Sequence, residues 1–379
     1  MTFEAPQTYP AKSADATAHG RFRAADSQMN SVERAGHRMA SAAGLRYVND
    51  ADSGLTRRRR KNGFMYIKPD GSKLNNQVEI RRIDSLAIPP AYRDVWICPD
   101  PDGHIQATAR DAKGRKQYRY HPRWQEIRSA TKFERMAAFG DALPRIRRTV
   151  SGLLRLDGMP REKVLAAVIQ LLDITMIRVG NDEYARRNRS YGLTTLCTRH
   201  VTVDGTTMVF EFRGKSGIAH CISVRHRGLA SFMRACLEIP GRELFQYLDD
   251  DGRRHAVTSG DVNAFLQTIA DASFTAKDFR TWGASALALR ELLKQRAESP
   301  AAAKKIVIAM IKSVAEKLGN TPSVCRKSYI HPQVADTFGG GTLHALKAKA
   351  RRGLRAHEAA LLALLNIEAK QAAIESALH

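Results

Sequence analysis

The sequence is poor in the features that mark secreted, membrane or zinc-binding proteins. It has no apolar run of about 18 residues, and its start shows no signal-peptide pattern. It contains only five cysteines, and no two of them form a C-x-x-C pair. These cysteines are Cys98, Cys197, Cys221, Cys236 and Cys325. We therefore expect reduced thiols in a cytoplasmic protein, with no disulfide framework, no zinc site and no membrane partner.

Signatures of nucleotide and metal chemistry are also missing. Residues 213–216 read Arg-Gly-Lys-Ser, like the end of a phosphate-binding P-loop, but that motif needs a glycine where this chain has Val209. The glycines at 339–341 do not form a dinucleotide fingerprint, and no cluster of His, Cys, Asp or Glu has metal-ligand spacing. We expect neither a nucleotide cofactor nor a metal.

Acidic residues are scarce beside basic ones. The chain has 38 Asp and Glu against 61 Lys and Arg, for a net charge of +23 spread along its 379 residues. Such an excess favours a polyanionic partner, and nucleic acid is the commonest of these. The 43% hydrophobic content and the length indicate a folded protein with more than one domain.

The local patterns predict an α+β protein in three parts. Residues 1–43 are rich in Ala, Ser, Gln and Thr without a sustained apolar period, which predicts a flexible arm. Residues 44–127 show short β-like runs between turn signals and predict a small β-rich domain. Residues 128–379 are mostly helical in pattern and predict a larger second domain.

Two basic stretches of the β-rich part allow alternative interpretations. The run at 57–61, Arg-Arg-Arg-Arg-Lys, fits either a solvated charge cluster or contact with a DNA backbone. Residues 114–121 interleave cations with aromatics. In a strand, Tyr118 and Tyr120 would face the same side, either toward nucleic acid or half-buried on the sheet.

The helical part contains one predicted sheet. A helix over 162–178 ends near residues 180–181 and leaves Arg178 at its C-terminal edge. Asp204-Gly205 is a strong hairpin signal, and Lys215 lies at the tip of a second hairpin. The predicted strands are 192–196, 201–203, 207–212 and 219–224.

Capping signals divide the remainder into helices. Thr275 and Asp278 resemble a capping box at the start of a helix that reaches about residue 295, with Lys277 and Arg280 on one face. The next helix runs from 299 to 318. A last helix is expected over about residues 343–378.

Residues 318–332 form the most informative stretch. Gly319 is a typical C′ glycine, Thr321 a good N-cap, and Pro322 suits the first position of a short helix that Pro332 would stop. Tyr329 then lies two turns into that helix among cations. Locally it is either a phosphate-seeking nucleophile or an ordinary packed tyrosine.

Phosphoryl chemistry without a metal needs three kinds of group. These are an oxygen nucleophile, fixed cations on the phosphate oxygens, and an acid for the leaving alkoxide. Tyr329 is the candidate nucleophile. Arg178 and Arg280 suit the phosphate because a guanidinium bonds in bidentate fashion and stays charged. Lys215 suits the acid, since nearby arginines depress a lysine pKa.

The order of these four residues resembles the type IB DNA topoisomerases, in particular the small poxvirus-like enzymes of bacteria. The resemblance covers roughly residues 44–340. It lies in the stretches 177–181, 192–196, 214–217, 277–282 and 323–330. Many relatives carry a histidine where this chain has Asn320, and the bacterial branch resembles this chain in carrying Asn. The resemblance implies that Asn320 and Lys277 contact the phosphate and that Gln117, Tyr118, Tyr120 and Tyr184 contact DNA.

The resemblance also implies a mechanism. Tyr329 would attack a DNA phosphodiester to give a 3′-phosphotyrosyl link, and Lys215 would protonate the leaving 5′ oxygen. The duplex would swivel and the strand would be rejoined, relaxing supercoils of both signs without ATP or metal. The family implies a monomer acting on double-stranded DNA in the nucleoid, and the catalytic fold of the tyrosine recombinases and type IB topoisomerases with a three-stranded sheet.

Two alternatives remain at this stage. Tyrosine recombinases share the chemistry, but they usually carry histidine where this chain has Asp278, and their amino-terminal domain is usually helical. A non-catalytic DNA-binding protein would account for the charge alone. It leaves the Arg, Lys, Arg and Tyr positions unexplained.

Overall fold

The computed structural model of the chain describes residues 31–61 and 63–377. By their contacts, the described residues up to Thr131 and those from Lys132 onward form two compact units. The first thirty residues of the predicted flexible arm lie outside the described residues. The arm does not extend to residue 43, because Ser31–Ala42 forms helix α2. Ala40 of that helix is fully buried in a small cluster with Leu45 and Trp124.

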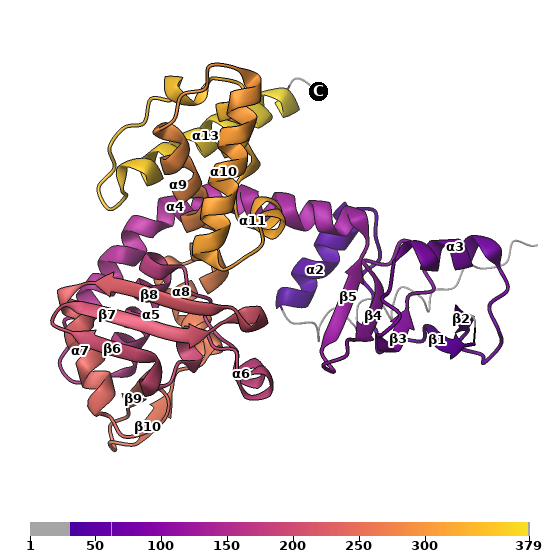
Figure 1. Ribbon diagram of the computed structural model, residues 1–379, viewed down its shortest axis with the longest axis horizontal. Helices are drawn as coiled ribbons and strands as arrows, with labels where there is room; N and C mark the ends of the chain where they lie inside the picture. The colour runs from indigo at the N-terminus through magenta and orange to yellow at the C-terminus, as the bar shows by residue number, and fades with distance from the viewer. Residues whose placement is uncertain (1–30, 62, 378–379) are drawn as a thin grey trace, which may run out of the picture. The chain divides into compact units, whose positions relative to one another are not determined.

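The first unit contains the predicted β-rich domain. Its five-stranded antiparallel sheet has the order β2-β1-β3-β4-β5 (Figure 1). The strands are β1 (Leu55–Arg60), β2 (Gly63–Ile67), β3 (Arg93–Ile97), β4 (Ile105–Arg110) and β5 (Lys116–Tyr120). Helix α3 (Gln77–Ser85), which the sequence patterns did not predict, contributes Ile83 to the core of this sheet.

The arginines at 57–60 lie on strand β1, and Arg57 is less exposed than the three that follow it. The guanidinium of Arg57 donates to the carbonyl oxygens of Ile88, Pro89 and Tyr92, each at 2.9 Å, and lies 4.2 Å from the ring centroid of Phe64. Arg57 therefore holds the loop between α3 and β3. The next three arginines along the strand are exposed.

The second unit is mostly helical and contains the predicted three-stranded sheet. Its sheet has the order β6-β7-β8, and a separate two-stranded sheet has the order β10-β9 (Figure 1). The strands are β6 (Val201–Asp204), β7 (Thr207–Arg213), β8 (Ala219–Arg225), β9 (Gln246–Leu248) and β10 (Arg254–Ala256). Helix α4 (Pro122–Leu153) begins in the first unit and continues into the second. The other long helices are α5 (Arg161–Thr175), α7 (Arg227–Glu238), α8 (Ser259–Ala270), α9 (Ala276–Leu293), α10 (Pro300–Leu318) and α13 (Ala356–Ala377). The short helices are α6 (Asp182–Asn188), α11 (Pro322–Ser328) and α12 (Pro332–Gly339).

Three predicted boundaries were wrong. Helix α5 ends at Thr175, because Met176 takes a left-handed conformation with φ of 56°. Pro332 does not stop α11, which has already ended at Ser328; it is instead the first residue of α12. The last helix begins at Ala356 rather than at 343, and only a 3₁₀ turn precedes it at Leu343–Ala345.

Helix α9 lies at the centre of the second unit and packs against α5, α8, α10, α12 and α13. Its Trp282 is 1% exposed and meets Phe139 of α4 edge-on, with ring centroids 6.2 Å apart. The close approach of the two helices depends on Gly140, where a Cβ would lie 2.5 Å from Cζ3 of Trp282. Among the described helices, none is long and apolar enough to cross a membrane.

We predict that Gly140→Ala lowers the free energy of unfolding by about 1–3 kcal/mol, because the added methyl overlaps a ring that has no room to move. Gly152→Ala is the matched control on the same helix, since a Cβ there meets nothing within 4 Å. It should be neutral or stabilising by at most about 1 kcal/mol. Thermal unfolding of both variants checks this, and equal melting temperatures would contradict the packing argument.

Candidate active site

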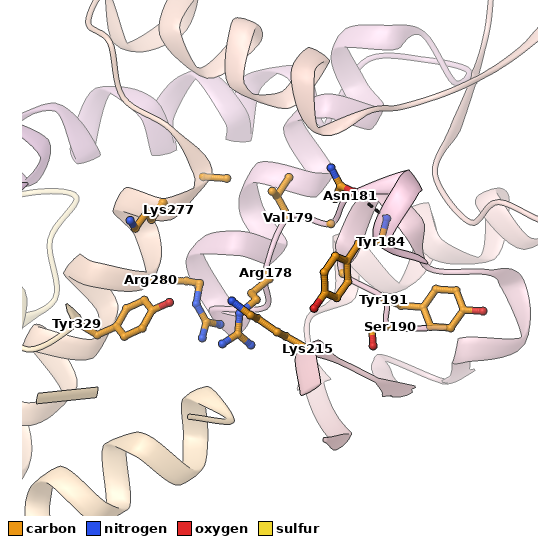
Figure 2. A pocket seen from close by; sticks show the side chains of 13 residues that line it. Arg178, Val179, Asn181, Tyr184, Ser190, Tyr191, Lys215, Lys277, Arg280 and Tyr329 are labelled. Carbon is orange, nitrogen blue, oxygen red and sulfur yellow. Dashed lines mark hydrogen bonds between the residues drawn. The ribbon is translucent and has the colours of Figure 1, made fainter. Parts of the chain in front are cut away.

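A pocket of about 330 Å³ in the second unit brings most of the predicted site residues together. They come from the loop after α5, the β7–β8 hairpin, helix α9 and the end of α11 (Figure 2). The lining includes Arg178, Tyr184, Lys215, Lys277, Arg280 and Tyr329. Asn320 reaches the same group through its hydrogen bond to Arg178.

The loop that carries Arg178 is fixed by a close backbone contact. Leu193 N–H donates to the carbonyl oxygen of Arg178 at 2.9 Å, and a Cβ at Gly192 would lie only 2.5 Å from that oxygen. Residues 192–196 were predicted to be a strand, and this was wrong: Leu193–Thr195 is a single 3₁₀ turn. Thr195 Oγ1, which accepts from Gly192 N–H at 2.9 Å, closes that turn.

Arg178 and Asn320 are joined directly. The Nη2 of Arg178 donates to Oδ1 of Asn320 at 2.6 Å. Asn320 is placed by the end of α10, where Gly319 has φ of +60° and the Asn320 N–H donates to the carbonyl of Ala315 at 2.9 Å. Its side-chain nitrogen, Nδ2, is buried and has no hydrogen-bond partner among the described residues.

Arg280 is buried, with 5% of its surface exposed. Its Nη2 donates to the carbonyl of Leu318 at 2.9 Å, and its Nη1 donates to that of Met176. Its Nε is buried with no partner in the described part of the chain. Burial, and then the charge of Arg178, lower its pKa to about 10, although Tyr329 opposes the shift. The guanidinium therefore stays charged at neutral pH.

Tyr329 caps helix α11 and points into this cationic group. Its ring centroid lies 5.3 Å from the guanidinium carbon of Arg280, and Figure 2 shows its hydroxyl directed toward Arg280 and Arg178. The carbonyl of Tyr329 accepts from Ser285 Oγ at 3.0 Å, which fixes the backbone. Burial raises the pKa of the phenol, but Arg280, Arg178 and Lys277 outweigh it, so the pKa lies below its usual value.

Two lysines complete the charge around the pocket. Lys215 lies in the turn between β7 and β8, as predicted, and Figure 2 shows its side chain reaching toward Arg178 and Arg280. Lys277 lies one turn before Arg280 on α9 and is exposed. Of the described residues, no Asp or Glu lines this pocket. The site therefore presents uncompensated positive charge to whatever enters.

The structure adds Lys132, which the sequence patterns did not predict. It lies on α4, its Nζ donates to the carbonyl of Ser328, and it is 5.5 Å from the ring centroid of Tyr329. Burial, and then Lys277, lower its pKa to about 8, against an opposing contribution from Asp278. No local pattern could have shown this residue, because its partners lie almost 200 positions away in the chain.

The other predicted DNA contacts lie on β5 in the first unit. Tyr118 is 41% exposed, and its ring is parallel to that of Tyr120 within 7°, with centroids 5.7 Å apart. The two rings share one face, as the strand period predicted. Gln117 is partly engaged, since its Nε2 donates to Asp111 at 3.0 Å.

The pocket is chemically suited to an anion with several oxygens. It offers two guanidinium groups and two lysines, together with the unpartnered donors Arg280 Nε and Asn320 Nδ2. The described residues contain no group of three or more His, Cys, Asp or Glu arranged to hold a metal ion. Among the hydroxyl groups that line the pocket, that of Tyr329 is directed at the two arginines (Figure 2).

Comparison with known families agrees with this geometry. Residues 121–352 match the family model described as the catalytic core of eukaryotic DNA topoisomerase I. The chain belongs to the type IB DNA topoisomerases. Residues 63–111 match the model for the N-terminal domain of bacterial DNA topoisomerase IB, so the β-rich unit is of the bacterial type.

Viral relatives show the same relationship. DNA topoisomerase 1B of Acanthamoeba polyphaga mimivirus is 32% identical over 288 residues, which cover 73% of this chain and 85% of the viral protein. DNA topoisomerase 1B of vaccinia virus is 24% identical over 223 residues, covering 58% of this chain and 68% of the viral protein. The family assignment confirms the predicted enzyme class, and with it a DNA substrate and the α+β fold.

We predict that Tyr329 titrates below the usual tyrosine value of 10.0 and that Arg280→Met raises its pKa. The sign follows because burial favours the neutral phenol, and the substitution removes the cation that most strongly offsets burial while leaving the ring covered. Carbon-13 NMR of Cζ-labelled tyrosine, assigned with Tyr329→Phe, measures both values.

Arg290→Met is the matched control on the same helix, because Arg290 pairs with Glu291 at 3.1 Å and does not line the pocket. It should leave the pKa of Tyr329 unchanged. A Tyr329 pKa at or above 10 in the parent protein would show that burial outweighs the cations, and an unchanged pKa in Arg280→Met would show that Arg280 does not act on the phenol.

Proposed function

We propose that this topoisomerase relaxes positive and negative DNA supercoils by cutting one strand through a 3′-phosphotyrosyl intermediate on Tyr329 and rejoining it, without ATP or metal. The observation that carries the proposal is the Tyr329 hydroxyl directed at Arg178 and Arg280, in a pocket whose described lining contains no carboxylate (Figure 2). A polyanionic phosphodiester is the substrate that this charge arrangement fits.

The proposed reaction is a transesterification. The Tyr329 oxygen forms a bond to phosphorus, and the bond from phosphorus to the 5′ oxygen breaks. The phenol gives its proton to water, and Lys215 gives one to the leaving 5′ oxygen, a step worth about 10²–10⁴-fold in rate. Attack by the free 5′ hydroxyl reverses these changes. Since one phosphate ester replaces another, bond energy is retained and no ATP is needed.

The cations stabilise the transition state. Arg178 and Arg280 would hold the non-bridging oxygens, on which negative charge accumulates. Lys277 adds positive charge from the turn of α9 that precedes Arg280. Arg280 Nε and the Asn320 amide supply two further donors, and each preorganised donor of this kind is worth about 10²–10³-fold. An amide can donate to a phosphate oxygen without carrying charge, so Asn320 acts by hydrogen bonding alone.

DNA is held by both units in this proposal. Tyr118, Tyr120 and Gln117 on β5, and Tyr184 beside the pocket, make contacts with the duplex. The net charge of +23 supplies phosphate contacts that added salt weakens. From the family to which the chain belongs, we expect a monomer that acts on nucleoid DNA in the cytoplasm.

Plasmid relaxation tests the central claim. With EDTA present and ATP absent, the parent protein should relax both negatively and positively supercoiled plasmid. Tyr329→Phe should bind DNA but show no relaxation, because it lacks the attacking oxygen. Denaturing a stalled reaction should leave the protein linked to the 3′ end of the cut strand.

Tyr247→Phe is the control tyrosine, since it lies on β9 stacked against His255 and away from the pocket. It should relax plasmid like the parent. Relaxation that requires a divalent metal or persists in Tyr329→Phe would refute the assigned nucleophile. Linkage to the 5′ end of the strand would refute the proposed polarity.

We predict that Tyr118→Ala weakens binding to duplex DNA by about 1 kcal/mol, or roughly fivefold in Kd. The plot of log Kd against log salt should keep its slope, because no charge is lost. Arg58→Ala, an exposed charge on β1, should instead reduce the slope if this strand contacts phosphates. Fluorescence anisotropy at several salt concentrations measures both, and an unchanged Kd for Tyr118→Ala would remove this tyrosine from the interface.

A further inference from the structure

His220 lies next to the proposed site but has no role in the reaction described above. It lies on β8, directly after the hairpin turn, and pairs with Phe212 across the strand ladder. The two rings are stacked, with centroids 5.0 Å apart and planes within 17°. The remaining edge of the imidazole is covered by backbone from two other segments, each of which has a glycine at the point of contact.

The two glycines show how closely the ring is enclosed. A Cβ at Gly214 would lie 2.6 Å from Cδ2 and Nε2 of His220. A Cβ at Gly319 would overlap Cε1 of the ring and lie 3.0 Å from Nε2. The pocket beside the ring has a cavity volume of about 10 Å³, which is room for about one water molecule. His220 thus fills the gap between the base of the β7–β8 hairpin and the C-terminal end of α10.

Both glycines directly precede residues of the proposed site. Gly214 is followed by Lys215, and Gly319 is followed by Asn320, which accepts the hydrogen bond from Arg178. The imidazole therefore contacts both the segment that carries the proposed acid and the segment that carries a proposed phosphate donor. A change in its volume would move one relative to the other.

The hairpin turn has few other restraints. Lys215, Ser216, Gly217 and Ile218 are all exposed, and the turn is closed by bonds within itself, from Gly214 N–H to the Ile218 carbonyl at 2.8 Å and from Gly217 N–H to the Gly214 carbonyl at 3.0 Å. These bonds fix the shape of the turn but not its position over the pocket. Position must come from the base, where the Arg213 carbonyl accepts from Tyr191 N–H at 2.7 Å and Gly214 is buried against His220.

Charge also favours a packing role for this ring. Burial, and then Arg178 and Arg280, lower the pKa of His220 below its usual value. The lysines that face the same space, Lys215 and Lys317, are cationic too, and none of the described residues lining it is acidic. The imidazole is thus neutral at neutral pH and can lie among four cations without adding a fifth.

We propose that His220 is a positioning residue that holds Lys215 where it can protonate the leaving 5′ oxygen. This rests on the proposed function, in which Lys215 is that acid. His220 itself contacts neither the phosphate nor the leaving group. We expect its main effect at the step in which the Lys215 proton moves to the 5′ oxygen as the bond to phosphorus breaks, because the exposed hairpin turn has fewer anchors than the segment that carries Asn320.

The leaving group distinguishes this role from a general loss of structure. In a DNA substrate whose scissile 5′ oxygen is replaced by sulfur, the departing thiolate is stable enough to leave without a proton. His220→Ala should slow single-turnover cleavage of the oxygen substrate by about 10- to 100-fold, the range expected for a displaced catalytic group. On the sulfur substrate its rate should be within about threefold of the parent, because protonation no longer matters.

Three further variants complete the experiment. His220→Phe, which keeps a flat ring between the two glycines, should recover most of the oxygen-substrate rate. His220→Gln, which keeps bulk but not the ring, should resemble His220→Ala and serves as the second test if the alanine variant is poorly folded. His255→Ala is the matched control, since it removes a histidine stacked on Tyr247 at 5.1 Å and 22°, away from the pocket, and should leave both rates unchanged.

Lys215→Ala tests the role of Lys215 separately from the role of His220. If this variant cleaves the oxygen substrate slowly but cleaves the sulfur substrate at nearly the parent rate, Lys215 is the acid. In that case, the positioning role alone would be overturned if His220→Ala and His220→Gln each slowed cleavage of the oxygen and sulfur substrates by the same factor. It would also be overturned if neither variant slowed cleavage of either substrate. If Lys215→Ala itself loses equally on both substrates, the proposed acid is wrong and the role of His220 falls with it.

Discussion

The structure of the site depends on holding cations close together without neutralising them. Arg280 is anchored by the carbonyl oxygens of Met176 and Leu318, and Lys132 by that of Ser328. These carbonyls lie at the C-terminal ends of α5, α10 and α11, where unpaired carbonyls and the helix dipole favour positive charge. A carbonyl can orient a guanidinium and leave its charge available, whereas a carboxylate would cancel it. Arg147 shows the contrast, because Asp173 and Glu358 bind it on both sides and it is fully paired.

This arrangement raises the free energy of the empty site, so that binding of an anion is favourable. The buried guanidinium of Arg280 lies near that of Arg178 and has lost its hydration. Its carbonyl partners compensate for this loss only in part, because they carry no charge and leave Nε without a bond among the described residues. The lowered pKa of Arg280 and the buried Nδ2 of Asn320, which has no partner among the described residues, have the same cause. In the proposed reaction, a phosphodiester would relieve it by supplying both negative charge and hydrogen-bond acceptors. The unpaired donors and charges of the pocket would then be available to stabilise a pentacoordinate phosphate.

Local chemistry in the sequence accounted for the parts of the site that are set by caps and turns. Gly319, Thr321 and Pro322 gave the end of α10 and the start of α11, and the signals around Lys215 gave the hairpin. The failures have a common physical cause. Residues 192–196 read as a strand because they are apolar and β-branched, but the contact of Gly192 with the Arg178 carbonyl imposes a 3₁₀ turn. Lys132 and His220 could not be found, because their roles depend on partners distant in the chain.

The nearby positive charges also favour an uncharged amide side chain at position 320. The Oδ1 of Asn320 must accept a hydrogen bond from Arg178, and the other end of the side chain must donate. An imidazole can do both only when neutral, since a charged imidazolium has two donors and no acceptor. Beside Arg178 and Arg280 a histidine would also lose protons readily, as His220 does. An amide performs both tasks at any pH, because its acceptor and its donor do not depend on a titration. In the proposed mechanism, Asn320 therefore supplies a hydrogen bond that does not depend on protonation, and it adds no charge of its own.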